Sequence, residues 1–127
     1  MVKTAEDALD AILARQGVRT DYPDEVLAEV DALMAAPGID DPALEDLTGL
    51  PFVTIDNEDS RDLDQALHIE RGADGAGFVV RYALADAAHF VKPESALFAE
   101  ALQRGVSYYL PGRCVPMLPP RLSEGIV

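Results

Sequence analysis

The sequence predicts an α+β fold, with a helical N-terminal segment followed by a strand-containing region. Before residue 49, apolar residues recur at the three- and four-residue spacing of helix faces. After residue 50, β-branched and aromatic runs separated by turn residues are typical of strands. The 127 residues are 49% apolar and 26% charged, which fits one globular domain rather than a disordered chain. We therefore divide the chain into a helical segment, 1–49, and a strand-containing portion, 50–127.

Two helices are predicted in the first segment. The first spans Ala5–Gln16 and ends at Gly17, because glycine is favoured just past a helix C-terminus. The second follows Tyr22–Pro23 and stops at Pro37–Gly38. A third, short helical turn is expected at 40–42. The acidic residues of this segment are scattered and indicate no site.

The second portion has the pattern of strands. Leu50–Ile55 predicts a buried strand because it is rich in β-branched and aromatic residues. Two more strands are predicted, at Ala66–Glu70 and Gly77–Leu84. The Asp74–Gly75 pair between these strands is a hairpin signal. The remaining pattern predicts a helix at Ser95–Gln103, a strand at Ser107–Leu110 and turns over 111–127.

The net charge is −13, from ten basic and 23 acidic residues. Taken alone, this argues against a phosphate-binding surface, because nucleic-acid affinity depends largely on Lys and Arg. Acids around a bound divalent ion are, however, neutralised in the working site. We expect no membrane span and no secretory signal, since the apolar runs are short and the first ten residues contain acids and no long apolar run. The single cysteine, Cys114, is expected to be buried and inert, in a cytoplasmic protein.

A cluster of carboxylates follows the predicted strand 50–55. Five acids fall within the nine residues Asp56–Asp64, a density that favours a cation among them. Oxygen donors of this kind suit Mg²⁺, Mn²⁺ or Ca²⁺. An EF-hand loop starting at Asp56 would need glycine at Arg61 and glutamate at Leu67, so this interpretation fails. A solvated acidic loop remains the alternative, and His68 on the next strand is expected to pack rather than to bind a metal.

The stretch LPFVTIDNEDSRDLDQAL, residues 50–67, resembles the signature of the ribonuclease II / ribonuclease R family, the RNB-domain exoribonucleases. That signature has an apolar strand, an aspartate, five further residues and then Asp-x-Asp-Asp-Ala. The resemblance extends over about residues 20–127, through YALADAAHFV at 82–91 and SYYLPG at 107–112. It implies the first part of a mixed-sheet RNB catalytic domain, incomplete in this chain.

The resemblance also implies a metal site. Asp56 and Asp62 match the family's first two metal-site aspartates, and Asp64 matches the third, beside the scissile phosphate. Asp62 and Asp64 are therefore the expected catalytic residues. Gln65 stands where the family usually has a fourth metal-coordinating aspartate. An amide oxygen still ligates hard ions, but it is neutral, so the site loses one charge.

The implied activity is processive 3′→5′ hydrolysis of single-stranded RNA to nucleoside 5′-monophosphates, assisted by Mg²⁺ or by Mn²⁺. Tyr109 matches a tyrosine that stacks on a base near the RNA 3′ end, and Arg113 and Arg121 are candidate phosphate contacts. The expected partners are single-stranded RNA and a second chain that is the remainder of the same protein. Two alternatives stay open: a catalytically impaired, RNA-binding RNB-like module, and an acidic metal-binding fold unrelated to RNA.

Overall fold

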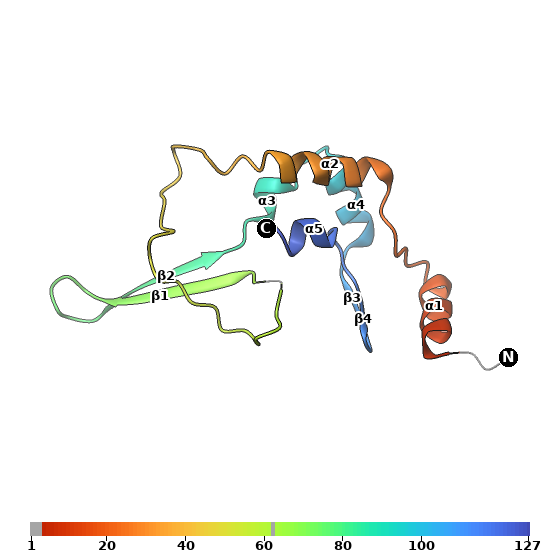
Figure 1. Cartoon of the computed structure of the whole chain (residues 1–127), viewed down its shortest axis with the longest axis horizontal. Coiled ribbons are helices and arrows are strands. Elements are labelled where there is room, and N and C mark those ends of the chain that lie inside the picture. The colour runs from red at the N-terminus through yellow and green to blue at the C-terminus, as the bar shows by residue number, and fades with distance from the viewer. Residues whose placement is uncertain (1–3, 62) are drawn as a thin grey trace.

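The computed structural model describes residues 4–61 and 63–127 and confirms the α+β class. In chain order the elements are α1 (Ala5–Arg15), α2 (Asp24–Ala35), β1 (Gln65–Arg71), β2 (Phe78–Leu84), α3 (Ala87–Phe90), α4 (Ala96–Arg104), β3 (Tyr108–Leu110), β4 (Arg113–Val115) and α5 (Pro120–Ser123). The strands form two antiparallel pairs, β1–β2 and β3–β4. The β1–β2 hairpin extends from one side of the molecule, and α1 lies at the other end (Figure 1).

Helix α1 confirms the helix predicted at Ala5–Gln16 and ends one residue earlier, at Arg15. The Thr4 hydroxyl accepts a hydrogen bond from the Asp7 backbone at 3.1 Å, and the Asp7 carboxylate accepts one from the Thr4 backbone at 2.9 Å. This reciprocal capping satisfies two backbone donors that the helix itself leaves free. The hydrogen bond that the Asp7 carboxylate accepts from the Thr4 backbone lowers the pKa of Asp7, and the Thr4 hydroxyl lowers it further. Gly17, at φ +67°, takes the left-handed conformation that ends the helix.

The β1–β2 hairpin confirms the turn predicted at Asp74–Gly75. Its register runs from Gln65 opposite Leu84 to Arg71 opposite Phe78. Gly75 has φ +72°, a conformation that side chains other than glycine rarely adopt. The Asp74 carboxylate accepts a hydrogen bond from the Ala76 backbone at 2.9 Å and holds the turn.

The prediction of a buried strand at Leu50–Ile55 is wrong. Within this described segment only Val53 pairs, in an isolated antiparallel bridge with Leu67, with both backbone hydrogen bonds at 2.9 Å. Ile55 is 84% exposed, because no described element covers this segment. Strand pairing is limited to Val53, and the Phe52 backbone donates to the Leu50 carbonyl at 2.8 Å in a tight turn. The predicted burial required a covering layer that apolar and β-branched composition does not specify.

Two shorter segments also differ from their predictions. The helical turn expected at 40–42 is a hydrogen-bonded turn, in which the Asp41 carboxylate accepts from the Ala43 backbone at 2.8 Å. Short acidic side chains compete with helical hydrogen bonding in this way. The tail predicted as turns contains β4, which pairs with β3 across a turn at Gly112, where φ is +73°.

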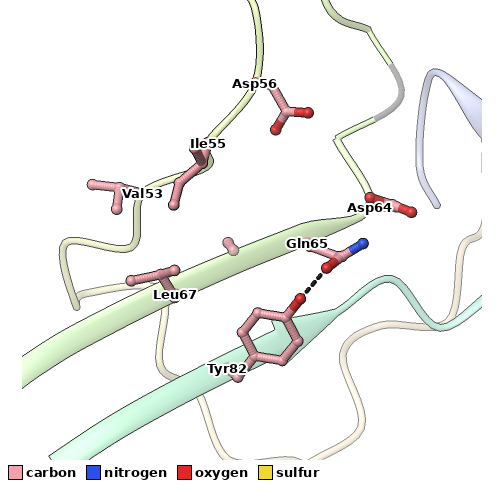
Figure 2. Close-up of a pocket in the computed structure, with 8 residues that line it drawn as sticks. Val53, Ile55, Asp56, Asp64, Gln65, Leu67 and Tyr82 are labelled. Atoms are coloured by element: carbon pink, nitrogen blue, oxygen red, sulfur yellow. Dashed lines mark hydrogen bonds between the residues drawn. The ribbon is translucent and has the colours of Figure 1, made fainter.

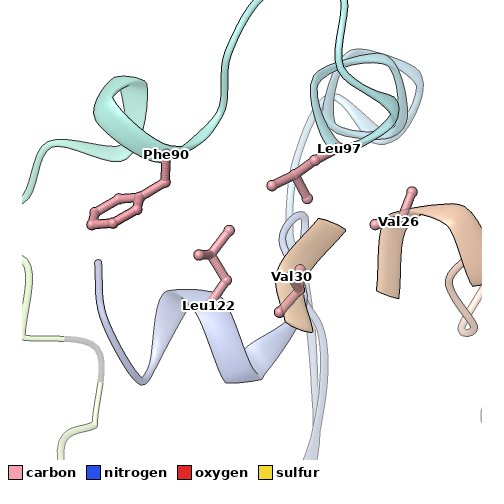
Figure 3. Packing of buried hydrophobic residues seen from close by; sticks show 5 residues of the cluster. All are labelled: Val26, Val30, Phe90, Leu97 and Leu122. Atoms are coloured by element: carbon pink, nitrogen blue, oxygen red, sulfur yellow. The ribbon is translucent and has the colours of Figure 1, made fainter. Parts of the chain in front are cut away.

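The hydrophobic core lies between α2, α4, α3 and α5. Five buried side chains form it, with Val26 and Val30 from α2 and one residue each from the other three helices: Phe90, Leu97 and Leu122 (Figure 3). Leu122 has no exposed surface. The core thus joins residues from both sides of residue 50.

Helix α4 receives its N-terminal cap from α2. The two carboxylate oxygens of Glu29 accept hydrogen bonds from the backbones of Ala96 and Leu97 at 2.9 and 2.8 Å. The Ser95 hydroxyl accepts a third from Phe98 at 3.0 Å. A negative carboxylate at a helix N-terminus also complements the helix dipole. Glu29 therefore fixes how α4 sits on α2.

Buried polar contacts attach the segment before α2 to α4. Glu100, buried on α4, accepts from Arg104 at 2.8 Å and from Arg19 at 2.5 Å. The Arg104 guanidinium lies over the Tyr22 ring, 3.9 Å from its centroid. The Tyr22 hydroxyl donates to the carbonyls of Pro116 at 2.7 Å and Leu118 at 2.9 Å. Tyr22 therefore links the start of α2 to the tail.

Replacing Tyr22 with phenylalanine should lower the free energy of unfolding by about 1 kcal/mol, the usual net value of a hydrogen bond. Burial raises the pKa of Tyr22 above 10.0, with Arg104 acting in the opposite direction. The parent's advantage should therefore be full below pH 10 and disappear as pH rises through the folded-state pKa. Urea unfolding of both proteins at pH 8 and at about pH 10.5 measures this difference. A difference that stays constant with pH would contradict the prediction.

Candidate metal and RNA site

Two of the predicted carboxylates line one pocket. Asp56 follows the Val53 bridge segment, and Asp64 directly precedes β1 (Figure 2). The Asp64 carbonyl accepts a hydrogen bond from the Ala85 backbone at 2.8 Å, which ties this end of the acidic loop to the end of β2. The pocket holds about 160 Å³ and is lined by Val53, Ile55, Asp56, Asp64, Gln65, Ala66, Leu67 and Tyr82.

The donors in this pocket have the chemistry of a hard-cation site. Asp56 and Asp64 contribute carboxylates, and Gln65, the first residue of β1, contributes an amide oxygen. Oxygen-only donors fit Mg²⁺ or Mn²⁺ rather than zinc. Asp62, the second aspartate of the predicted set, lies outside the described residues. Among residues 4–61 and 63–127, no three His, Cys, Asp or Glu side chains gather in a metal-binding group.

Tyr82 is a pocket residue that sequence reasoning missed. Its hydroxyl, on β2, donates a hydrogen bond to Oε1 of Gln65 on β1 (Figure 2). Leu67 pairs with Tyr82, and Gln65 pairs with Leu84, so Gln65 and Tyr82 are diagonal neighbours on one face. The predicted hairpin implies a strand register, and that register was the signal that could have placed Tyr82 next to Gln65.

A second, larger groove of about 820 Å³ contains Tyr109. One wall is the acidic loop, with Asn57, Asp59, Ser60 and Arg61, and the other is formed by side chains between Ser107 and Glu124. Tyr109 is 77% exposed, so its ring is accessible for stacking. Arg61 supplies positive charge to the groove. No role was predicted for Arg61, because it lies within a loop that is otherwise acidic.

The two arginines predicted to contact phosphates form ion pairs on the outside of the molecule. Arg113 pairs with Asp10 of α1 at 2.5 Å, and Arg121 pairs with Asp31 of α2. Neither lines the Tyr109 groove. The expectation that Cys114 is buried is wrong, because Cys114 is exposed and lines that groove. Strand β4 is short, and no other described layer packs over the thiol of Cys114.

The histidines and Asp86 have structural contacts. His68 lies 3.8 Å from the Glu70 carboxylate, and its ring centroid lies 5.9 Å from that of Phe52. Arg81 donates to Glu70 and lowers the pKa of that carboxyl, with a smaller contribution from His68. Asp86 caps α3 by accepting from the His89 backbone at 3.1 Å. These residues therefore support the hairpin and the turn after it.

Within the part of the chain that the structure describes, no helix combines the length and apolar character needed to cross a bilayer.

Comparisons with known proteins identify the family. The RNB domain family model matches residues 44–127, more than half of the chain. Ribonuclease R of Mycoplasmopsis pulmonis is 39% identical over 125 residues, and Exoribonuclease 2 of Vibrio cholerae is 43% identical over 107. These alignments cover 93% and 77% of this chain but only 16% of each relative. The chain thus corresponds to a small part of those proteins.

A solved structure agrees with these relatives. Mycoplasma genitalium RNase R in complex with double-stranded RNA superposes with a TM-score of 0.80 at 34% identity. The match covers 94% of this chain and 21% of that one. With the family model, the relatives and the superposition in agreement, the chain belongs to the family of RNB-domain ribonucleases.

Proposed function

We propose that this chain supplies the metal-binding part of a processive 3′→5′ exoribonuclease, which hydrolyses single-stranded RNA to nucleoside 5′-monophosphates. One observation carries the proposal. Asp56 and Asp64 line the same pocket as Gln65, in a chain that belongs to the RNB-domain ribonucleases. Two carboxylates and an amide oxygen around one small pocket are suited to holding a cation against a phosphate.

In this proposal the polar residues of the pocket and Asp62, which lies outside the described residues, have separate roles. Asp56 and Asp62 hold a Mg²⁺ or Mn²⁺ ion, and Gln65 adds a neutral oxygen donor. Asp64 is placed by the scissile phosphate and, together with Asp62, would act on it through a bound ion. When bound, the ion supplies activation of water and neutralises charge that develops on the phosphate. The loss of one negative charge at Gln65 leaves the pocket less acidic than a set of four aspartates.

The Tyr109 groove is the proposed path of the RNA. An exposed aromatic ring stacks on any base, and such stacking contributes about 1–3 kcal/mol per base. Arg61 lies in the same groove, where it is placed to contact a phosphate. Arg113 and Arg121 remain candidate phosphate contacts, which would exchange Asp10 and Asp31 for the RNA backbone.

The proposed partner, besides RNA, is a second chain that is the remainder of the same protein. The hairpin supports this, because Phe78, Val80 and Leu84 are each at least 60% exposed. Apolar side chains this exposed on a strand pair are typical of a surface that another layer covers. We propose a cytoplasmic setting, which suits a chain with one exposed, unpaired thiol.

The test uses the protein as it is purified, with any chain that accompanies it. Single-stranded RNA labelled at its 5′ end is incubated with Mg²⁺ or with EDTA, and the products are separated on a gel. We expect Mg²⁺-dependent loss of the full-length RNA to a very short labelled product, the signature of 3′→5′ hydrolysis. Intact RNA under both conditions would contradict the enzymatic function of this chain.

The second candidate function is an RNA-binding module that does not cleave. Gln65 favours it, because a neutral residue replaces a charged ligand of the metal site. Fluorescence anisotropy with the same RNA separates the two functions. Binding without degradation in Mg²⁺ would support the module, and degradation would exclude it.

A further inference from the structure

The β3–β4 hairpin has two faces, and the Tyr109 groove lies on one of them. Tyr109 pairs with Cys114, and both residues line the groove. The next pair along the hairpin, Leu110 with Arg113, points to the opposite face, because side chains alternate along a strand. Arg113 accordingly lines a different cleft, of about 350 Å³, and not the groove. The Arg113 side chain therefore lies behind the surface that carries the Tyr109 ring.

Helix α1 forms the other wall of this cleft, beside the turn end of the hairpin (Figure 1). The Arg113 guanidinium pairs with the Asp10 carboxylate of α1 at 2.5 Å. Both side chains reach water, so this is an exposed ion pair. Leu13, almost one turn further along α1, is buried although it does not belong to the five-residue core. Helix α1 is therefore packed on the chain as well as paired with the hairpin.

The hairpin depends on contacts with its surroundings because it is small. Strands β3 and β4 have three residues each, and no further strand among residues 4–61 and 63–127 pairs with them. A two-stranded hairpin alone is at best marginally stable in water. Near its base, the Ser107 hydroxyl accepts a hydrogen bond from the Met117 backbone at 2.9 Å, and Val115 is buried. At the turn end, the pair of Asp10 with Arg113 joins the hairpin to α1.

We infer that α1 positions the β3–β4 hairpin for RNA binding, with Asp10 as the positioning residue, an inference that rests on the proposed RNA path along the Tyr109 groove. Asp10 acts through Arg113 from behind the hairpin, so the ion pair and an RNA in the groove use different faces. The pair holds the turn end and keeps the Tyr109 ring in the groove. A base then stacks on a ring whose place is already fixed, which reduces the loss of entropy on binding.

The experiment exchanges the two charges and measures single-stranded RNA binding by fluorescence anisotropy. It uses the protein as purified, in EDTA and at one salt concentration, because salt alone changes RNA affinity. An exposed ion pair contributes up to a factor of about 5 in an equilibrium constant. We expect Asp10→Arg to raise the Kd by about 5-fold, although added positive charge by itself strengthens RNA binding. The swap Asp10→Arg/Arg113→Asp rebuilds the pair and should return the Kd to within about 2-fold of the parent's.

A second readout needs no RNA. The chain contains no tryptophan, so Tyr109→Trp places a single indole on the hairpin. The fluorescence anisotropy of this indole should fall when Asp10→Arg is added and recover in the swap, because the turn end is released and then held again. Ala11→Arg is the control, since it adds positive charge at an exposed position of α1 that does not line the cleft. It should weaken neither RNA binding nor the anisotropy of the indole.

Tighter RNA binding by Asp10→Arg would overturn the inference and would favour a direct phosphate contact of Arg113. A swap that binds as weakly as the single variants would also overturn it, because aspartate at position 113 would then repel RNA irrespective of α1. If the parent binds RNA and Asp10→Arg changes neither readout, α1 does not hold the hairpin, and the proposed function stands. A parent that binds no RNA would overturn both the RNA path and the role of Asp10.

Discussion

Asp64→Asn is expected to reduce Mg²⁺-dependent RNA degradation by at least about 100-fold, the loss typical of removing one group that stabilises charge in a reaction. Asparagine has nearly the same shape, so the pocket and the backbone contact of residue 64 with Ala85 should persist. What is lost is one of the two described carboxylates of the pocket. The gel assay measures the rate, and anisotropy measures RNA affinity, which should remain within a few fold of the parent's.

Glu58→Gln is the matched control for this prediction. It removes one charge from the same acidic loop, but Glu58 lines neither the carboxylate pocket nor the Tyr109 groove. Its degradation rate should equal the parent's. Equal rates for Asp64→Asn and the parent would show that Asp64 is not part of the reaction. A similar loss in both variants would indicate a general effect of the loop charge.

Leu122→Ala is expected to lower the free energy of unfolding by about 3 kcal/mol, from the lost apolar transfer and the cavity that remains. Leu122 is fully buried between α2 and the segments that carry Phe90 and Leu97 (Figure 3). The short helix α5 offers little local stability of its own, because it spans only Pro120–Ser123. Its attachment therefore depends on this side chain. Urea denaturation followed by circular dichroism measures the change.

Leu102→Ala provides the comparison for the core. Leu102 lies on α4 and is 68% exposed, so its truncation should change the free energy of unfolding by less than about 0.5 kcal/mol. If the two substitutions cost the same, then α5 is not docked on α2 in solution. If Leu122→Ala costs several times more, the packing of the tail is essential to the fold.

Helices α1, α2 and α4 and the β1–β2 hairpin were predictable because local signals agreed with each other, whereas the four-residue helices α3 and α5 were not predicted. The apolar spacing and Gly17 indicated α1 and its end, and the Asp74–Gly75 turn indicated the hairpin of β1 and β2. The pairing of β3 with β4 was missed because strands of three residues carry too little pattern. The burial expected for Leu50–Ile55 failed because it depends on what covers the segment, and not on the segment itself.

The candidate site was predictable to a different extent. The family pattern predicted that Asp56 and Asp64 belong to one site, and both residues line one pocket, although their role stays a prediction. The assignment of Arg113 and Arg121 as phosphate contacts stays a prediction. Their ion pairs were not foreseen, because the acidic partners lie on α1 and α2, far away in sequence. The contact of Tyr82 with Gln65 needs the side chains of two paired strands, and no pattern within either strand specifies it.

The carboxylate of Glu29 that caps α4 has a consequence for the synthesis of the chain. The donors it binds, at Ala96 and Leu97, lie 67 and 68 residues further along. At roughly 5–20 residues per second, a ribosome adds Ala96 about 3–13 s after Glu29. During this interval α2 has neither the helix that it caps nor the partners of Val26 and Val30. The apolar face of α2 therefore stays unpacked, in solvent or on a chaperone, until the residues that form the rest of the core have been synthesised.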